Sequence, residues 1–496
     1  KFINNFNKNR FVIMPNRARK LVLSTFTQTE VVDPSHVGAT RINLSKTAQY
    51  HITPVTQNLF EYDSELGTRE TLTTVQYNLF PIVVDSKRIP WTEANIYILD
   101  RIKNSINFVM ATYSNIASAL AAYRQFLDEF EIGWEVFDKN KLYRPTYRYR
   151  AYLRSLIDTD EVSVSSARRR MSSVIAFYRW LQSEGVLKPD FPMWRESDQY
   201  IDIKNEYGIS FSKKIKSTDV SIKVVKSQNP YADTISDGGQ LRPLFKEEQF
   251  WLLKALIALN NTEMFLIHLL ALASGARLQT ILTIRLHHVL TDMSGSNLNE
   301  IRIPAGPSTG IDTKNNKKLV LHLPLWLYQK LHIYANSENA KKRRVKSSLG
   351  NSEVQFLFLS NRGKPYYQSK DEIQTFRQEF DLHHSKNGQT VRQFINDKII
   401  PYIREEEAKP KFRYRFHDLR ATYGMNLTDE QLENVARGRI SLHQAREFVR
   451  VRMCHESSAT TDLYLQYRQN LMHIRQVASS YNDHLCEIVN RLELGY

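Results

Sequence analysis

The amino-acid sequence predicts a mainly α-helical protein with a small β component. Apolar residues recur at helical spacing through residues 91–190 and again through 245–273. Alternating apolar residues appear only in short stretches, such as Glu300 to Pro304 and Lys318 to Pro324. At 496 residues the chain exceeds what one ordinary hydrophobic core organises, so we expect two or three domains.

Residues 1–90 lack helical periodicity. They mix β-branched and aromatic residues with Thr, Asn and Pro, a composition that favours short strands and loops. We therefore predict an extra α+β region there, which carries no chemical motif.

Residues 91–190 predict a compact domain of about four helices. Pro145 is expected to open the third helix and Gly185 to stop the last one. The last helix starts with three cations, Arg168, Arg169 and Arg170. Cations beside the positive end of a helix are electrostatically unfavourable, so we expect these arginines to contact phosphate.

Residues 191–240 lose periodicity and are rich in Lys, Ser, Asp and Gly, ending in Asp237-Gly238-Gly239. This composition predicts a basic linker or extended strap.

In residues 241–475, the two strand-like stretches predict a β-hairpin with lysines near its tip. Residues 341–346 form a basic run that contains Lys341, Lys342, Arg343 and Arg344. We expect a surface loop there, either phosphate-contacting or merely solvated, rather than a nuclear-localisation signal. Residues 476–496 predict an amphipathic C-terminal helix.

The charge balance indicates a polyanionic partner. Lys and Arg number 68 against 52 Asp and Glu, for a formal net charge of +16. Ribosomal, RNA-binding and membrane-surface proteins are basic too, so charge alone selects no function.

The only cysteines, Cys454 and Cys486, exclude a disulfide framework, and no apolar run approaches the roughly 20 residues of a membrane span. We expect a cytoplasmic protein with no membrane partner and no secretory leader.

A set of arginines, histidines and one tyrosine carries the chemistry. Arg277 follows Gly275 at the end of an apolar stretch, and His417 and Arg420 lie three residues apart. His455 precedes Tyr464 by nine residues. Arginine suits the charge that develops on phosphate oxygens, and tyrosine can attack phosphorus if its site favours the phenolate.

Each of these motifs alone is weak evidence for a catalytic site. A lone His-x-x-Arg is more often an exposed pair, and 25 tyrosines and 14 histidines make some nine-residue spacing expected by chance. The string His-x-Ser-x-x-Thr-Thr-x-x-Tyr, from His455 to Tyr464, is far more specific. Its position in the chain after Arg277 and Arg420 makes the whole set more specific still. Tyr467 is a rival nucleophile at a less suitable spacing.

These motifs resemble the tyrosine recombinases, also called the phage-integrase family. The resemblance covers roughly residues 241–475, and more weakly 91–190. It implies a mixed α/β catalytic domain and a helical, SAM-like core-binding domain, respectively. Residues 1–90 match no part of the family's pattern; our hypothesis for them is an arm-type DNA-binding or interaction domain. Our hypothesis for residues 476–496 is that they dock on a neighbouring protomer.

The resemblance also implies residue roles. The catalytic set would be Arg277, Lys314, His417, Arg420, His455 and Tyr464, with Tyr464 the nucleophile and Lys314 the general acid on the hairpin; Lys317 and Lys318 are alternatives to Lys314. This chain has Thr280 where the family usually has an acidic residue and Cys454 where it usually has glycine.

The implied function is site-specific recombination through a 3′-phosphotyrosine, as the integrase or transposase of a mobile genetic element. No metal, ATP or other cofactor is expected. The expected partners are double-stranded DNA, a second protomer on each core site and four protomers in the synaptic complex, in a nucleoid-associated setting. A type IB topoisomerase or telomere resolvase would use the same chemistry. A non-catalytic DNA-binding protein is the third alternative.

Overall fold

The structure is a computed structural model that describes residues 17–32, 71–105, 108–204, 210–223, 233–293, 295–374 and 386–493. Most of the strands and loops predicted for residues 1–70 lie outside these ranges. The chain divides into two compact units, residues 1–226 with 382–384, and residues 227–381 with 385–496. The division falls inside the segment predicted to be a linker.

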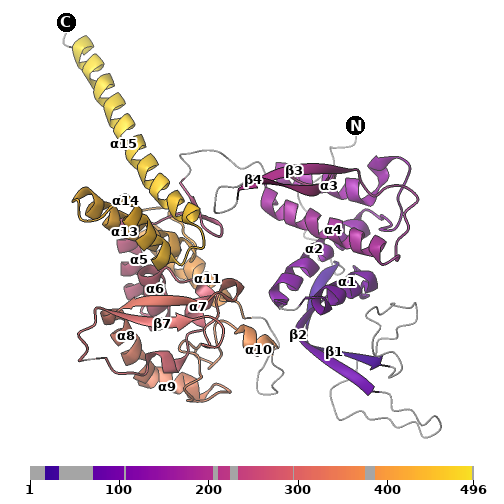
Figure 1. Ribbon diagram of the computed structural model, residues 1–496, viewed down its shortest axis with the longest axis horizontal. Coiled ribbons are helices and arrows are strands. Elements are labelled where there is room, and N and C mark those ends of the chain that lie inside the picture. Colours follow the sequence, from indigo (N-terminus) through magenta and orange to yellow (C-terminus); the bar gives the residue numbers. More distant parts are fainter. Residues whose placement is uncertain are drawn as a thin grey trace. The chain divides into compact units, whose positions relative to one another are not determined.

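Helices dominate the described residues, as the periodicity predicts. The first unit contains α1 (Thr92–Lys103), α2 (Met110–Glu129), α3 (Pro145–Asp158) and α4 (Val164–Ser183) (Figure 1). Helix α3 begins at Pro145, and Gly185 follows the end of α4 with a φ of 69°. The Ser163 side chain caps α4 by accepting a hydrogen bond from the Ser166 amide, so the helix starts slightly earlier than predicted.

Two long strands belong to the same unit as these helices. Strands β1 (Arg19–Val32) and β2 (Thr71–Val84) pair antiparallel and pack against α2 (Figure 1). Phe26 stacks on Phe80 with ring centroids 4.4 Å apart, and Phe80 is buried. The described part of residues 1–90 therefore shares a core with the helices.

The prediction of a linker or extended strap over residues 191–240 is partly wrong. Strands β3 (Glu196–Lys204) and β4 (Ser210–Thr218) form an antiparallel hairpin, whose ladder satisfies backbone groups that an extended strap would leave to water. A second, very short hairpin, β5 (Ile235–Ser236) and β6 (Gln240–Leu241), belongs to the second unit.

The second unit surrounds a largely apolar helix, α6 (Thr262–Ser274). The other described helices of this unit are α5 (Lys246–Ala258), α7 (Leu278–Leu282), α8 (Leu325–Asn336), α9 (Glu338–Val345), α10 (Lys370–Gln374), α11 (Gln389–Phe394), α12 (Ile400–Glu406), α13 (Asp418–Ala436), α14 (Leu442–Met453) and α15 (Ser458–Glu493). The predicted hairpin forms as β7 (Glu300–Ala305) and β8 (Leu319–Pro324). Short η3 (Leu286–Val289), η4 (Lys314–Asn316) and η5 (Ile395–Ile399) complete the unit.

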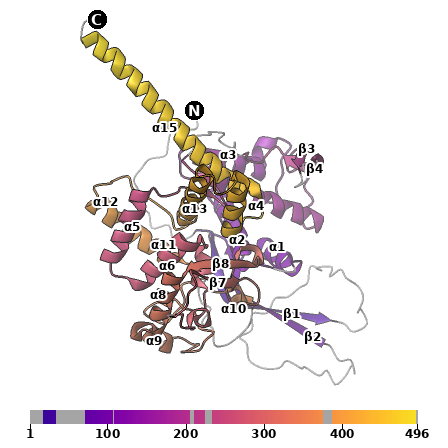
Figure 2. The same ribbon diagram turned by 60° about the vertical axis from the view of Figure 1, so that its left-hand side comes forward.

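Helix α6 is buried on nearly all sides, with Leu266, Ile267 and Leu270 almost inaccessible to solvent. It packs against α13 and β8, so the start of α13 is held against the unit's core. Helices α13 and α14 lie beside the first turns of α15 in both views (Figure 1, Figure 2). Helix α13 thus connects α14 and α15, which carry candidate residues, to the main core around α6.

The C-terminal helix predicted over residues 476–496 is the continuation of α15 rather than a separate element. Leu485, Ile488 and Val489 on it are exposed. Among the described residues, no helix has both the length and the apolar character needed to cross a bilayer.

Candidate active site

Arg277 lies where the sequence predicts, just beyond the end of α6. Gly275 caps that helix with a φ of 64°, and Arg277 precedes α7 in an extended conformation. Its side chain is 27% exposed to solvent. The buried α6 therefore fixes the backbone of Arg277, while its side chain remains partly exposed.

His417 and Arg420 occupy the N-terminal end of α13, with His417 at the N-cap position. Arg420 is buried, with only 5% side-chain exposure. Its Nη1 donates to the Gly275 carbonyl at 2.9 Å and its Nη2 donates to the Met453 carbonyl at 2.7 Å. These two bonds tie the ends of α6 and α14 to α13 and fix the direction of the guanidinium.

His455 lies in the turn between α14 and α15, and Tyr464 lies in the second turn of α15. Cys454 ends α14 in the left-handed conformation, with a φ of 53°, which explains why glycine suits this position. The Nδ1 of His455 lies 3.0 Å from the Thr461 hydroxyl, and its ring centroid lies 5.6 Å from that of Tyr464. Tyr464 has no solvent exposure.

A carboxylate that the sequence reasoning missed joins these side chains. Oδ2 of Asp237 accepts hydrogen bonds from Arg420 Nε at 2.8 Å and from the Tyr464 hydroxyl at 3.1 Å. It also lies 3.2 Å from His455 Nε2, and Oδ1 lies 3.9 Å from Arg277 Nη2. Four of the predicted residues therefore converge on one small anion.

The remaining predicted residues surround the next residue, Gly238. A Cβ built on Gly238 would lie 3.5 Å from Lys314 Nζ, 3.8 Å from His417 Nε2 and 3.9 Å from Arg277 Nη2. All six predicted catalytic residues thus gather around Asp237 and Gly238, although they come from separate parts of the sequence.

The hairpin lysines differ in their surroundings. Lys314 lies on η4 in the β7–β8 connection, exposed to solvent, with its ammonium group nearest to Gly238. Lys317 forms an ion pair with Glu456, the residue after His455. Lys318 is exposed at the edge of β8. Of the three, Lys314 is the lysine placed among the other candidates.

The electrostatics favour neutral histidines and a protonated phenol in this conformation. Burial, followed by the charge of Asp237, raises the pKa of Tyr464 well above its ordinary value, against the opposing charge of Arg420. Burial and the charges of Arg277 and Arg420 lower the pKa of His417. Burial also lowers the pKa of His455, although Asp237 opposes that shift.

The rival nucleophile Tyr467 lies elsewhere in the same region. It is 9% exposed and packs in an apolar cluster with Ile235 and Leu241. Tyr464 belongs to that cluster too, but its hydroxyl reaches the Asp237 carboxylate. Of these two tyrosines, Tyr464 is the one whose hydroxyl contacts the carboxylate that Arg420 and His455 also contact.

The predicted DNA contacts on the first unit remain accessible in part. Arg168 and Arg169 are exposed one turn into α4, whereas Arg170 is half-buried.

The interpretation of residues 341–346 as a surface loop is wrong. Residues 338–345 form α9, capped by the Ser337 side chain. Arg344 is buried at 3% exposure and donates to Asn351, and Arg343 pairs with Glu263 at 2.9 Å. Lys341 pairs with Glu338, and Lys342 is exposed. The fold thus turns Arg344 inward, away from any external phosphate.

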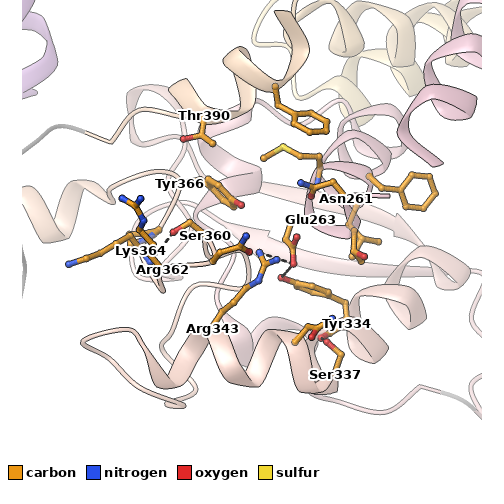
Figure 3. A pocket seen from close by; sticks show the side chains of 18 of the residues that line it. Asn261, Glu263, Tyr334, Ser337, Arg343, Ser360, Arg362, Lys364, Tyr366 and Thr390 are labelled. Atoms are coloured by element: carbon orange, nitrogen blue, oxygen red, sulfur yellow. Dashed lines mark hydrogen bonds and ion pairs between the residues drawn. The ribbon is translucent and has the colours of Figure 1, made fainter. Parts of the chain in front are cut away.

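A cavity of about 1210 Å³ lies between α6, α8 and α9, and none of the six candidate residues lines it. Figure 3 shows Arg343 reaching Glu263, which also accepts a hydrogen bond from the Tyr334 hydroxyl. Glu263 and Arg343, which both line the cavity, thus neutralise each other's charge. The candidate site is therefore elsewhere, around Asp237.

No protein-family model and no curated protein matches the sequence. Among solved structures, the chain is similar to a lambda integrase dimer bound to a COC′ core site, at 15% identity and a TM-score of 0.40, covering 75% of this chain and 95% of that chain. It is also similar to a Tn1549 transposon integrase in complex with a circular intermediate DNA, at 13% identity and a TM-score of 0.42, covering 75% and 94%. At identities this low, the chemistry must be inferred from this chain's own side chains.

Proposed function

We propose that this chain is a tyrosine recombinase, a DNA strand transferase that cuts and rejoins duplex DNA through a 3′-phosphotyrosine. The observation that carries the proposal is the convergence of Arg277, Arg420, His455 and Tyr464 on one carboxylate. A phosphodiester, like a carboxylate, is a compact anion that accepts charge-assisted hydrogen bonds from guanidinium groups.

In the proposed first step, the phenol oxygen of Tyr464 attacks phosphorus in line with the departing 5′ oxygen. A bond forms between Tyr464 and phosphorus, and the bond from phosphorus to the 5′ oxygen breaks. Arg277, Arg420 and His455 hold the non-bridging oxygens, where negative charge builds up. Arginine retains its charge throughout, so this stabilisation needs no proton transfer.

Two protons move during the step. The phenol loses its proton, a transfer that His417 assists, and the neutral state of that histidine favours this role. Lys314 gives a proton to the leaving 5′ oxygen, which becomes a hydroxyl. Attack by the 5′-hydroxyl of a partner strand then reverses each transfer and frees Tyr464.

The rest of the chain would hold DNA. Arg168 and Arg169 are exposed and would contact phosphates, as would Lys342. We propose double-stranded DNA as the partner, two protomers on each core site and four in the synaptic complex. We further propose that the chain acts as the integrase or transposase of a mobile genetic element.

Nicked suicide duplexes, taken from the DNA that flanks the gene, test the proposal. Cleavage beside the nick releases a short strand, so the covalent protein–DNA adduct accumulates. The expected result is a denaturant-resistant adduct with the wild-type chain and with Tyr467→Phe, and none with Tyr464→Phe. An adduct that persists with Tyr464→Phe contradicts the proposal. Covalently closed ends on these linear duplexes would indicate a telomere resolvase, and relaxation of a supercoiled plasmid without site preference would indicate a topoisomerase.

A further inference from the structure

The hairpin of residues 235–241, here called the plug hairpin, fills the candidate active site. Its strands pair Ile235 with Leu241, and both side chains are 2% exposed. The amide of Asp237 donates to the Gly239 carbonyl at 3.0 Å, which closes the tip. Gly238 at the tip has a φ of 69°, a backbone conformation that glycine adopts without strain.

The plug hairpin is anchored by apolar packing and by backbone hydrogen bonds. Ile235 and Leu241 pack in an apolar cluster with Met425, Val449 and Tyr464. A guanidinium nitrogen of Arg415 donates to the Gln240 carbonyl, and the amide of Arg242 donates to Asp418 at 3.1 Å. These contacts present Asp237 to the candidate catalytic residues as part of the fold.

Asp237 uses the donors that a phosphate needs. Its Oδ2 takes the Nε hydrogen of Arg420 and lies within hydrogen-bond distance of His455 Nε2, while Oδ1 lies 3.9 Å from Arg277. Each of these donor groups is one that the proposed reaction directs at the non-bridging oxygens of the scissile phosphate. A carboxylate and a phosphate cannot share them, so occupancy by one excludes the other.

The same contact disables the nucleophile. The Tyr464 hydroxyl donates its hydrogen to Asp237 Oδ2 at 3.1 Å, and Tyr464 is completely buried. An oxygen that is inaccessible and engaged with a carboxylate has no line of attack on DNA. Cleavage therefore requires that the plug hairpin withdraw first.

We infer that Asp237 is an internal mimic of the scissile phosphate, and that the plug hairpin holds the enzyme inactive until a DNA phosphate displaces it. The inference rests on the proposed function, because it identifies the displaced anion with the substrate. Exchange of one anion for another keeps Arg277 and Arg420 compensated, so displacement avoids the cost of leaving buried charges unpaired.

The neighbours of the Asp237 carboxyl favour its anionic form. Burial by itself raises the pKa of the Asp237 carboxyl, but the hydrogen bond from His455 and the charge of Arg420 outweigh it and hold that pKa well below its ordinary value. The lowered pKa favours the anionic form of Asp237, which a second anion would have to displace.

The first experiment compares the wild-type chain with Asp237→Asn, which removes the charge at nearly constant shape. Asp233→Asn is the matched control, since Asp233 is an exposed acid four residues earlier. We expect calorimetry to show that Asp237→Asn binds inorganic phosphate at least about tenfold more tightly than the wild type, because a hydrogen bond to a charged group shifts an equilibrium by that order. The rate of adduct formation on nicked duplexes should rise by a similar factor, and the control should match the wild type in both assays.

The results for Asp237→Asn distinguish a failure of the phosphate-mimic inference from a failure of the proposed recombinase function. Unchanged phosphate affinity, together with equal or slower adduct formation by Asp237→Asn, overturns the inference and makes Asp237 a supporting carboxylate of a working recombinase. Tighter phosphate binding without an adduct from either protein supports the occlusion of an anion site and rejects recombination.

A second measurement uses the wild-type chain, in case Asp237→Asn fails to fold. Hydrogen–deuterium exchange is followed at the amides of residues 235–241 with and without a short mixed-sequence duplex at low salt. Faster exchange at these amides when DNA is bound supports displacement. Equal protection in the bound complex overturns it.

Discussion

Arg420 donates from Nε to Oδ2 of Asp237 over 2.8 Å, across 183 positions of sequence. The other two nitrogens of the same guanidinium bond the carbonyls of Gly275 and Met453. One buried side chain therefore links α6, α13, α14 and the plug hairpin. Arg420 is expected both to grip phosphate and to hold the site together.

Arg420→Lys should lower the free energy of unfolding by about 3 kcal/mol, because a single ammonium group cannot reach all three acceptors and leaves buried groups unpaired. Arg277→Lys should cost less than about 1 kcal/mol, since Arg277 is partly exposed and 3.9 Å from Asp237. Both variants should lose adduct formation. Urea unfolding followed by circular dichroism measures the stabilities, and equal losses would contradict the linking role of Arg420.

Gly424 allows the ring of Tyr464 to lie against α13. A Cβ built on Gly424 would lie 2.4 Å from Tyr464 Cε1 and 2.9 Å from Met453 Cε. Gly424→Ala should therefore destabilise the unit by roughly 1–3 kcal/mol through overpacking, and should slow adduct formation by shifting the phenol. Gly295→Ala is the control, because nothing lies within 4 Å of a Cβ there. Wild-type stability and adduct rate in Gly424→Ala would show that the ring does not pack in this way.

His268 should make stability depend on pH. The ring is fully buried on α6, with Nδ1 2.6 Å from the Met264 carbonyl and Nε2 3.1 Å from the Tyr414 hydroxyl. Burial lowers its pKa from 6.5 to about 4. Between those two pH values the unfolded chain binds more protons than the folded chain, so stability falls as pH falls.

The loss attributable to His268 should reach about 3 kcal/mol at pH 4. It is read as the difference between the wild-type chain and His268→Gln in urea unfolding from pH 7 to pH 4. His268→Gln should be the less sensitive of the two to acid, because glutamine does not titrate. Parallel pH profiles would show that His268 titrates equally in the folded and unfolded chains.

Local patterns were enough to predict most of the helices and the order of the candidate residues. Pro145 starts α3, Gly275 ends α6 ahead of Arg277, and the spacing of His417 and Arg420 places both at the start of α13. These features follow from helix geometry and capping, which act over a few residues. The β7–β8 hairpin was predicted for the same reason.

Features that depend on distant contacts were missed. Asp237 stood out only as an acid before two glycines in a basic stretch, because its partners lie far along the chain. The run from Lys341 to Arg344 was judged by its charge, although Ser337 and Glu338 signal a helix start. Whether an arginine such as Arg344 faces inward is decided by packing against the rest of the unit, which no local pattern encodes.

Mass spectrometry of the trapped adduct tests the central claim most directly. After nuclease and protease digestion of the complex formed on nicked duplexes, the account predicts a nucleotide joined through its 3′ phosphate to Tyr464. The linkage should survive acid, as a phosphotyrosine ester does and a phosphohistidine does not. A nucleotide attached to Tyr467, to another side chain, or to no residue in an active preparation would contradict the account.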